Sequence, residues 1–209
     1  MSRTSRPSDS TPPPDQRAVD GRRRRGHDNR ERIVKAMIDI VQSGEVAPSA
    51  EQVALKADVG LRTVFRHFED MDSLYREIGA LIGDRVRAIL GPPLTGEGWE
   101  ARLIETLARR VRAFETIAPF KRSADAFRHR SRYLGSDYAE LLVDLRNRLI
   151  AILPPEIASD PHRLEALDLL LSYEAWSRLR REQGLAPPRA LAVLEDAVRR
   201  TISREPPPA

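Results

Sequence analysis

The stretch "VGLRTVFRHF", residues 59–68, contains side chains that can bind an anion. These are Arg62, Thr63, Arg66 and His67. On a helix, Val64 and Phe68 lie four positions apart and share one face. The two arginines and the histidine lie largely away from that face. The pattern is suited to a core on one side and an anionic partner on the other. A solvated basic face on an ordinary amphipathic helix is the alternative that spacing leaves open.

The residues before this stretch predict a second, shorter helix. In "PSAEQVALKADVG", Ser49 is a good N-cap, and Gln52 three residues later completes a capping-box pattern. "ADVG" then interrupts the helical pattern, and "LRTVFRHF" resumes it. A helix, a turn of about three residues and a second helix form a helix-turn-helix. In that motif the second helix enters the major groove of DNA, so we expect Arg62, Arg66 and His67 to face DNA.

Composition excludes several classes of protein. The 209 residues are 41% hydrophobic and 32% charged, enough for one sizeable core or two small ones. The absence of cysteine excludes disulfide frameworks, thiolate zinc sites and cysteine nucleophiles. No apolar run approaches the roughly 20 residues that span a bilayer, and the N-terminal residues lack the apolar region of a secretory signal. We therefore expect a cytoplasmic protein without a membrane partner.

The net charge of +4 belongs to the N-terminal segment. Residues 1–30 contain eight arginines and four aspartates, and the remaining residues are balanced. Proline, serine and charged residues dominate this segment, so we expect residues 1–26 to form a disordered, arginine-rich arm. Beside a nucleic-acid module, Arg24 and Arg25 become candidate contacts to phosphates or the minor groove. A purely solubilising tail is the alternative.

The remaining pattern is helical, without strand-like alternation. "NRERIVKAMIDIVQSG" predicts a first helix that stops at Gly44. Further helices are expected over 99–117, from Pro119 to Gly135, and over 136–153. We therefore predict an all-α fold, with a three-helix, helix-turn-helix DNA-binding domain over 27–78 and a larger helical domain over 79–205, to which the family resemblance described below assigns ligand binding and dimerisation.

The last two predicted helices carry more apolar surface than one face requires. The first opens with Asp160 as N-cap and Pro161, and closes at Gly184. Its middle, "LDLLLSYEAW", is apolar on more than one face. The second covers "PPRALAVLEDAVRRTI". This surplus favours a homodimer, although both faces could be covered within one chain.

From "RERIVKAMIDIVQSG" to "SAEQVALKADVGLRTVFRHFEDMDSLYREI", the sequence resembles the N-terminal domain of the TetR family of transcriptional regulators. The matching positions are Ser49, Val53, Ala54, Ala57, Val59, Thr63, Val64, Phe65, His67, Phe68 and Leu74. The resemblance implies a dimer that pairs through its last two helices, a palindromic double-stranded DNA operator, and repression relieved by a small-molecule effector. The DNA-contact residues expected together from the motif and the arm are Arg24, Arg25, Ser49, Gly60, Leu61, Arg62, Thr63, Phe65, Arg66 and His67.

Four departures from the family pattern change the expected contacts. Asp58 stands in place of a glycine in the turn, and aspartate tolerates the left-handed conformation better than most residues. Gly60 replaces a serine cap and is weaker. Phe65 replaces a tyrosine whose hydroxyl commonly contacts phosphate, and Met71 replaces a lysine. Residues 31–78 are net negative, with six basic and nine acidic residues, so phosphate binding must rely on Arg66, His67, helix N-termini and the arm.

The resemblance implies an effector pocket in the larger domain, residues 79–205. Candidate lining residues are large aromatic side chains or polar residues on largely apolar helices. They are Thr106, Phe114, Phe127, Tyr133, Tyr138, Asp168, Tyr173 and Trp176. Aromatic residues at helical spacing are also typical of an ordinary core, which is the alternative for each of them.

Sequence motifs of enzymes are missing. The four histidines show no metal-ligand spacing, and neither HExxH, GxSxG nor a glycine-rich phosphate loop occurs. We expect no catalytic residue, no cofactor and no metal. A ligand-independent or architectural DNA-binding protein stays open as an alternative, as does, more distantly, an all-α enzyme.

Overall fold

The computed structural model describes residues 14–127 and 134–203, and within these ranges the chain is helical with no strand. The expected all-α fold is confirmed. The elements in chain order are α1 (Pro14–Gln42), α2 (Ala50–Ala57), α3 (Leu61–His67), α4 (Met71–Leu90), α5 (Gly98–Phe127), α6 (Leu134–Ile150), α7 (Pro155–Ala158), α8 (Pro161–Leu170), α9 (Tyr173–Ser177), the π-helical turn η2 (Arg178–Glu182) and α10 (Pro187–Ser203). None of the described helices is both long enough and apolar enough to cross a membrane.

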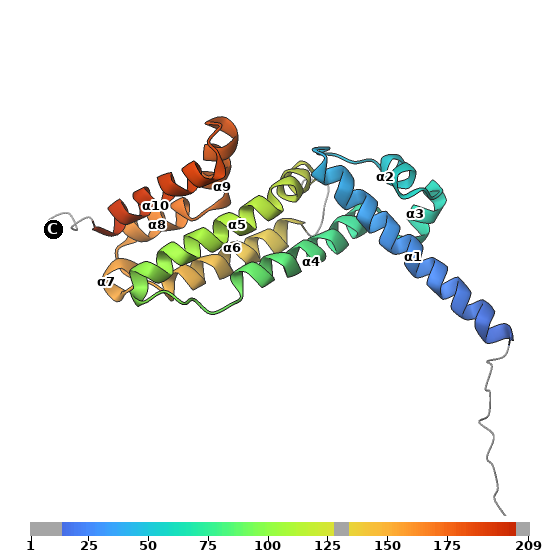
Figure 1. Cartoon of the computed structure of the whole chain (residues 1–209), viewed down its shortest axis with the longest axis horizontal. Coiled ribbons are helices and arrows are strands. Elements are labelled where there is room, and N and C mark those ends of the chain that lie inside the picture. The colour runs from blue at the N-terminus through green and yellow to red at the C-terminus, as the bar shows by residue number, and fades with distance from the viewer. Residues whose placement is uncertain (1–13, 128–133, 204–209) are drawn as a thin grey trace, which may run out of the picture.

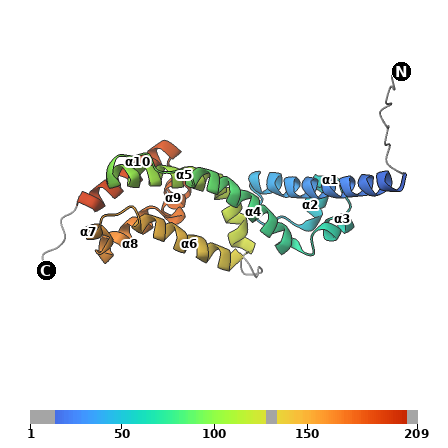
Figure 2. The same cartoon turned by 90° about the horizontal axis from the view of Figure 1, so that it is seen from below.

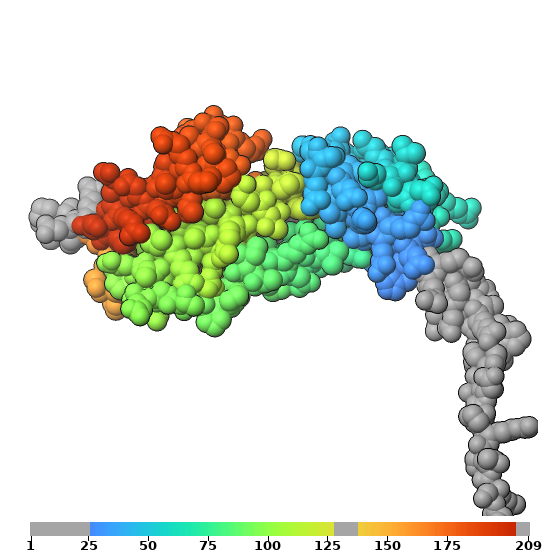
Figure 3. Space-filling model, viewed as in Figure 1, coloured from blue at the N-terminus to red at the C-terminus, as the bar shows by residue number. Residues whose placement is uncertain are grey.

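The molecule is elongated, with α1, α2 and α3 at one end and α7, α8 and α10 at the other (Figures 1 and 2). The helices α4 and α5 run through the middle and connect the two ends. The space-filling view shows α9 and α10 rising on one side, separated from the α1–α3 end by the surface of α5 (Figure 3). A signal that passes between the two ends must therefore pass along α4 or α5.

Two hydrophobic cores hold the two ends. The first contains fully buried side chains from each of the first four helices; examples are Ile33, Met37, Val53, Val64 and Leu74. The second joins α5, α6, α8 and α10; examples are Leu103, Leu107, Leu149, Leu167 and Val198. Burial of each such side chain contributes roughly 1.5–3 kcal/mol, so both ends have a substantial apolar interior.

The helix α5 runs through Pro119 without a break. This differs from the sequence prediction, which divided the segment into two helices at that proline. Proline inside a helix costs about 3 kcal/mol, because it removes one hydrogen bond and its ring is crowded. Packing beyond it offsets the cost: Ser123 Oγ is 3.0 Å from Tyr75 Oη, and Phe127 stacks on Tyr75 with ring centroids 4.5 Å apart. The C-terminal end of α5 thus packs against α4 at the first core.

The long helix predicted between Asp160 and Gly184 is divided in the structure. Asp160 caps α8 as expected, but α8 ends at Leu170. Ser172 then starts α9, since its Oγ accepts a hydrogen bond from the Ala175 amide at 3.1 Å. A serine that caps a new helix competes with continuation of the old one. Gly184, with a positive φ of 66°, follows the π-helical turn η2.

The start of α1 also differs from the prediction. The expected disordered arm covered residues 1–26, whereas α1 begins at Pro14 and is continuous to Gln42. A helix that is already nucleated extends at low cost, because each added residue brings its own hydrogen bond. The boundary expected between residues 78 and 79 falls inside α4, so one continuous helix links the two parts of the molecule.

Candidate nucleic-acid interface

The helix-turn-helix is formed by α2, the turn 58–60 and α3. Ser49 caps α2: its Oγ accepts from the Gln52 amide at 3.2 Å, and Gln52 Oε1 accepts from the Ser49 amide at 2.7 Å. The capping box predicted from the sequence is confirmed. The pKa of the Glu51 carboxyl group is lowered, mainly by a hydrogen bond from the Ser49 hydroxyl.

Asp58 makes the tight turn between α2 and α3. It has φ 51° and ψ 53°, the left-handed conformation that was expected where the family has glycine. Arg32 of α1 stabilises this turn, because its Nη2 donates to the Asp58 carbonyl oxygen at 2.9 Å and to Oδ2 at 3.0 Å. The position of α3 relative to α1 therefore depends on a side chain from outside the motif.

The helix α3 has a buried face and an exposed face, as its sequence predicted. Val64 is only 1% exposed; Phe68 is 2% exposed too, but it follows the end of α3 with an extended backbone (φ −132°, ψ 122°) instead of continuing the helix as predicted. On the opposite side, Arg62 and Arg66 are exposed, and Phe65 is 46% exposed. Phe65 thus adds an apolar side chain to an exposed face that also carries two arginines. The exposed face is suited to contact with a partner that has both charged and flat apolar groups.

Arg62 and Arg66 form no hydrogen bond or ion pair with the part of the chain that the structure describes. Many other arginines of the chain are used internally, including Arg30 and Arg32. An arginine without an internal partner keeps all five of its N–H donors for a ligand. The two exposed arginines of α3 thus present unneutralised positive charge.

Arg30 of α1 holds the C-terminal end of α3. Its Nη1 donates to the His67 carbonyl oxygen at 2.8 Å, and its Nε donates to Glu77 Oε1 at 3.1 Å. The second branch of its guanidinium forms a close ion pair with Glu77 Oε2. The guanidinium also lies 4.4 Å from the centre of the Phe68 ring. One side chain thus joins α1, α3 and α4, a role that the sequence analysis did not identify.

His67 lies differently from the prediction. It was expected to point toward DNA with Arg62 and Arg66, but its Nε2 is buried and has no hydrogen-bond partner among the described residues. Burial, followed by the charges of Arg66 and Arg30, lowers the pKa of His67 from 6.5. His67 is the last residue of α3 and lines a groove of about 980 Å³ between α1 and α4. Its Nε2 is thus not on the exposed face of α3 that carries Arg62 and Arg66.

The remaining predicted DNA contacts are placed as follows. Gly60 precedes α3 without any side-chain cap, as expected, and Leu61 is 38% exposed at the helix start. Thr63 is half-buried. The side chains of Arg24 and Arg25 lie outside the described residues, so only their position within α1 is defined.

Some predicted effector residues meet at one cavity. It has a volume of about 340 Å³ and lies between α5, α6 and the α8–α9 junction. Four of the predicted residues line it: Phe114, Tyr138, Asp168 and Tyr173. The Tyr173 hydroxyl is buried without a hydrogen-bond partner among the described residues. Tyr138 donates to Glu174 Oε1 at 2.9 Å, so part of the polar lining is already satisfied.

The other predicted effector residues lie elsewhere. Phe127 stacks on Tyr75 beside the first core. Trp176 is 1% exposed, and its Nε1 donates to Glu115 Oε1 at 2.9 Å, as expected of a core residue. Thr106 lines a separate cavity that shares Arg110 and Leu145 with the cavity of about 340 Å³, and Tyr133 lies outside the described residues.

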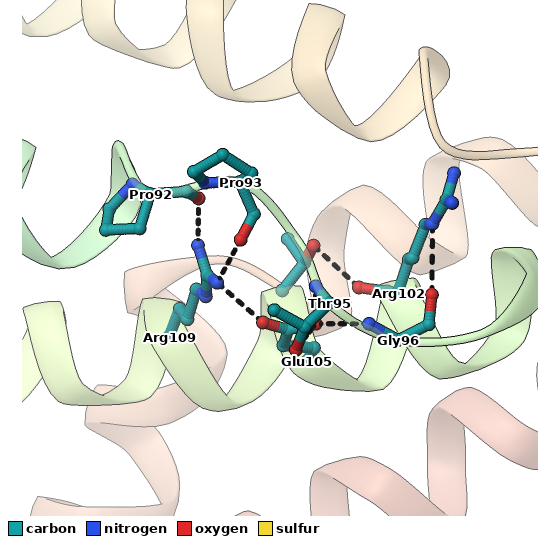
Figure 4. Close-up of polar contacts among 8 residues, drawn as sticks. Pro92, Pro93, Thr95, Gly96, Arg102, Glu105 and Arg109 are labelled. Atoms are coloured by element: carbon teal, nitrogen blue, oxygen red, sulfur yellow. Dashed lines mark hydrogen bonds and ion pairs between the residues drawn. The ribbon is translucent and has the colours of Figure 1, made fainter.

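The loop between α4 and α5 is fastened by two residues of α5 (Figure 4). Arg109 donates to the carbonyl oxygens of Pro92 and, at 2.7 Å, Pro93, while Glu105 accepts from the Thr95 and Gly96 amides at 2.8 and 2.9 Å. Glu105 and Arg109 also bind each other at 2.6 Å. Arg109 is only 8% exposed, because its guanidinium is covered by the loop that it binds.

Comparison with known proteins shows a similarity to a solved structure. No protein-family model matches the sequence, and no curated protein matches it. The structure is similar to the crystal structure of a transcriptional regulator from Rhodococcus sp. Rha1, with a TM-score of 0.64 and 20% sequence identity. The match covers 83% of this chain and 96% of that chain. The present chain therefore shares the all-α fold of that regulator over most of its length.

Proposed function

We propose that this protein is a sequence-specific DNA-binding transcriptional regulator of the TetR type. The observation that carries the proposal is the exposed face of α3, where Arg62 and Arg66 have no internal partner and Phe65 is open to solvent. The opposite face of the helix is buried at Val64, and Phe68 directly after the helix is buried too, so the exposed side chains are presented on a rigid support. Recognition helices of helix-turn-helix proteins read bases in this way.

The N-terminal helix extends the proposed DNA surface. The arginine run at Arg22–Arg25 lies within α1, before the residues that pack in the first core. Lysine and arginine contacts to phosphate supply most non-specific affinity for DNA. Residues 31–78 are net negative and supply little of this affinity. We therefore assign the arginine run to phosphate contacts beside the bases that α3 reads.

The protein acts as a homodimer in this proposal. Leu169 on α8 is 63% exposed, and Val193 on α10 is 41% exposed. The last two long helices thus keep apolar surface that their own chain leaves open, which supports pairing through them. A two-fold dimer places two copies of α3 on one DNA duplex, so the operator has two symmetric half-sites.

Effector control is assigned to the larger helical part of the molecule, which contains α5 to α10. Two cavities of this part are the candidate effector sites in this proposal: one of about 340 Å³ beside Tyr173, and a second of about 260 Å³ beside Thr106. The helix α4 begins directly after the helix-turn-helix and ends at Leu90, on the wall of the second cavity. A ligand that shifts this end of α4 would change the position of α3 and release the DNA, so repression relieved by ligand is the mode of action that we propose.

Selection of DNA fragments from a random pool by the purified protein, followed by sequencing, tests the proposal. We expect an enriched site with two-fold symmetry. The same selection with Arg62→Ala/Arg66→Ala should enrich no site, while the variant should keep the melting temperature of the original protein because both side chains lack internal partners. Uniform enrichment of all sequences by the original protein would refute sequence-specific regulation and favour an architectural DNA-binding role.

A further inference from the structure

A second cavity lies between the α4–α5 loop, α5 and the C-terminal end of α6. Its volume is about 260 Å³. Three arginines line it, Arg109, Arg110 and Arg148, and no carboxylate does. The rest of the lining is largely apolar. It includes Leu90 at the end of α4 and Ile152 just after the end of α6. The neighbouring cavity on the other side of Arg110, by contrast, includes three acidic residues, Glu165, Asp168 and Glu174.

The three arginines of this cavity differ in how their charge is neutralised. Arg109 binds Glu105 at 2.6 Å, and Arg148 binds Asp144 at 2.8 Å. Arg110 has no carboxylate oxygen within 4 Å among the described residues. Its Nη2 donates to the Leu145 carbonyl oxygen at 2.5 Å and its Nη1 to the Leu171 carbonyl oxygen at 3.2 Å. Two of its five N–H groups are thus used, both by neutral acceptors.

The positive charge of Arg110 is buried without a counter-ion. The residue is 2% exposed. A buried charge is costly unless an opposite charge accompanies it. Burial lowers the pKa of Arg110 to about 10, and Asp168, the acid that most opposes this effect, is itself bound by Arg146 Nη1 at 3.0 Å. An anion is the group that the surroundings of Arg110 lack.

We infer that this cavity binds a small organic carboxylate, with its anionic group at Arg110 and its apolar part against Leu90 and Ile152. A guanidinium group and a carboxylate form strong, charge-assisted hydrogen bonds. The volume equals that of roughly nine water molecules at about 30 Å³ each, so the ligand has about ten non-hydrogen atoms or fewer. The loop fastened by Arg109 (Figure 4) forms one wall of the cavity through Pro92, Pro93 and Leu94.

The role of this carboxylate as the effector rests on the proposed function. The binding of the carboxylate does not. Binding itself is measured without DNA, so its failure is distinguishable from failure of DNA recognition. The probes are benzoate and hexanoate, with benzyl alcohol and benzylamine as the neutral and cationic counterparts of benzoate. Thermal unfolding of the full chain at constant ionic strength should show a rise of roughly 2–5 °C with the carboxylates, near ten times their Kd, and none with the counterparts.

Three variants locate the site. Arg110→Met should abolish the response to benzoate. Ala151→Phe places an aromatic ring at an exposed position that lines this cavity, so it should also abolish the response without loss of basal stability. Leu142→Phe, at a 45% exposed position that lines the neighbouring cavity, is the matched control and should keep the response.

Other outcomes would overturn the inference. Equal responses to benzoate and benzyl alcohol would show that charge is irrelevant. Absence of any response to both carboxylates would show that the cavity binds no such anion. A response that survives Ala151→Phe but is lost in Leu142→Phe would assign the ligand to the neighbouring cavity instead.

Discussion

Arg30 donates from Nη1 to the main-chain carbonyl oxygen of His67 at 2.8 Å and so joins the first helix to the last residue of α3. Carbonyl groups at the end of a helix have no partner within that helix. The seven-residue α3 is too short to be stable by itself, so its geometry depends on such outside contacts. The same guanidinium pairs with Glu77 of α4, which fixes the recognition helix between two longer helices.

Replacement of Arg30 should therefore weaken the helix-turn-helix. We expect Arg30→Met to lower the free energy of unfolding by about 1–2 kcal/mol, since charge-assisted hydrogen bonds at a partly exposed site are lost. Urea unfolding followed by circular dichroism measures this change. Arg62→Met is the matched control, because it removes an arginine without an internal partner and should stay within about 0.5 kcal/mol. Equal effects of both substitutions would argue against the role of Arg30.

The second prediction concerns base reading by Arg62. Arginine can donate two hydrogen bonds to O6 and N7 of guanine, a contact worth about 1–3 kcal/mol of discrimination. Arg62→Ala should relax the preference at one symmetric pair of operator positions, by roughly 5- to 150-fold in relative affinity, while non-specific binding stays nearly intact. Competition binding on operators that carry single substitutions measures the loss. A uniform decrease at all sequences would show that Arg62 only contacts phosphate.

The local features of this fold could be predicted because they depend on neighbouring residues. The capping box at Ser49 and the turn at Asp58 are determined by a few consecutive side chains, and both are confirmed. The division of α8 from α9 at Ser172 had an equally local signal, a serine capable of capping, but the apolar run around it predicted continuation. The competing signals could be resolved only by the structure.

The partners of long side chains could not be predicted. Arg30 reaches residues 37 and 47 positions away, and Arg110 reaches a carbonyl group 61 positions away. Such contacts depend on how whole helices pack, which periodicity does not define. Pro119 was misread for the same reason, because its helix continues through contacts that Tyr75 provides from another element.

The third prediction is a pH dependence that originates at His67. Its pKa in the folded state is lowered from 6.5, mainly by burial, so the folded protein binds fewer protons than the unfolded chain below that pH. The stabilising contribution is complete above about pH 6.5 and declines as the pH falls toward the folded-state pKa. Urea midpoints should thus fall more between pH 7.5 and 5.5 in the original protein than in His67→Gln. Parallel declines in both proteins would contradict this assignment.

The fourth prediction concerns the arginine run in α1. Arg24→Gln/Arg25→Gln keeps residues with good helix propensity and removes two positive charges. If both side chains contact phosphate, the slope of log K against log salt should flatten by about 1.8, from about 0.9 for each contact. Arg189→Gln/Arg199→Gln removes the same charge from exposed positions of α10 and should leave the slope unchanged. Equal slopes for both double variants would make the run a solubilising segment.

The last prediction concerns the homodimer. Two exposed leucines offer a matched pair of positions: Leu169 on α8 is 63% exposed, and Leu55 on α2 is 83% exposed. A leucine buried at an interface contributes about 1.5–3 kcal/mol, and two-fold symmetry places it there twice. Leu169→Glu should therefore raise the dimer dissociation constant at least about 100-fold, since each protomer also brings an unpaired carboxylate to the interface. Sedimentation velocity over a concentration series measures this change. Leu55→Glu makes the same chemical change at the opposite end of the molecule and should leave the dimer intact. If dissociation follows Leu55→Glu, or neither substitution, pairing does not occur through α8. Where Leu169→Glu dissociates the dimer as expected, its DNA affinity should fall as well, because the second half-site contact is missing although its α3 surface is unchanged.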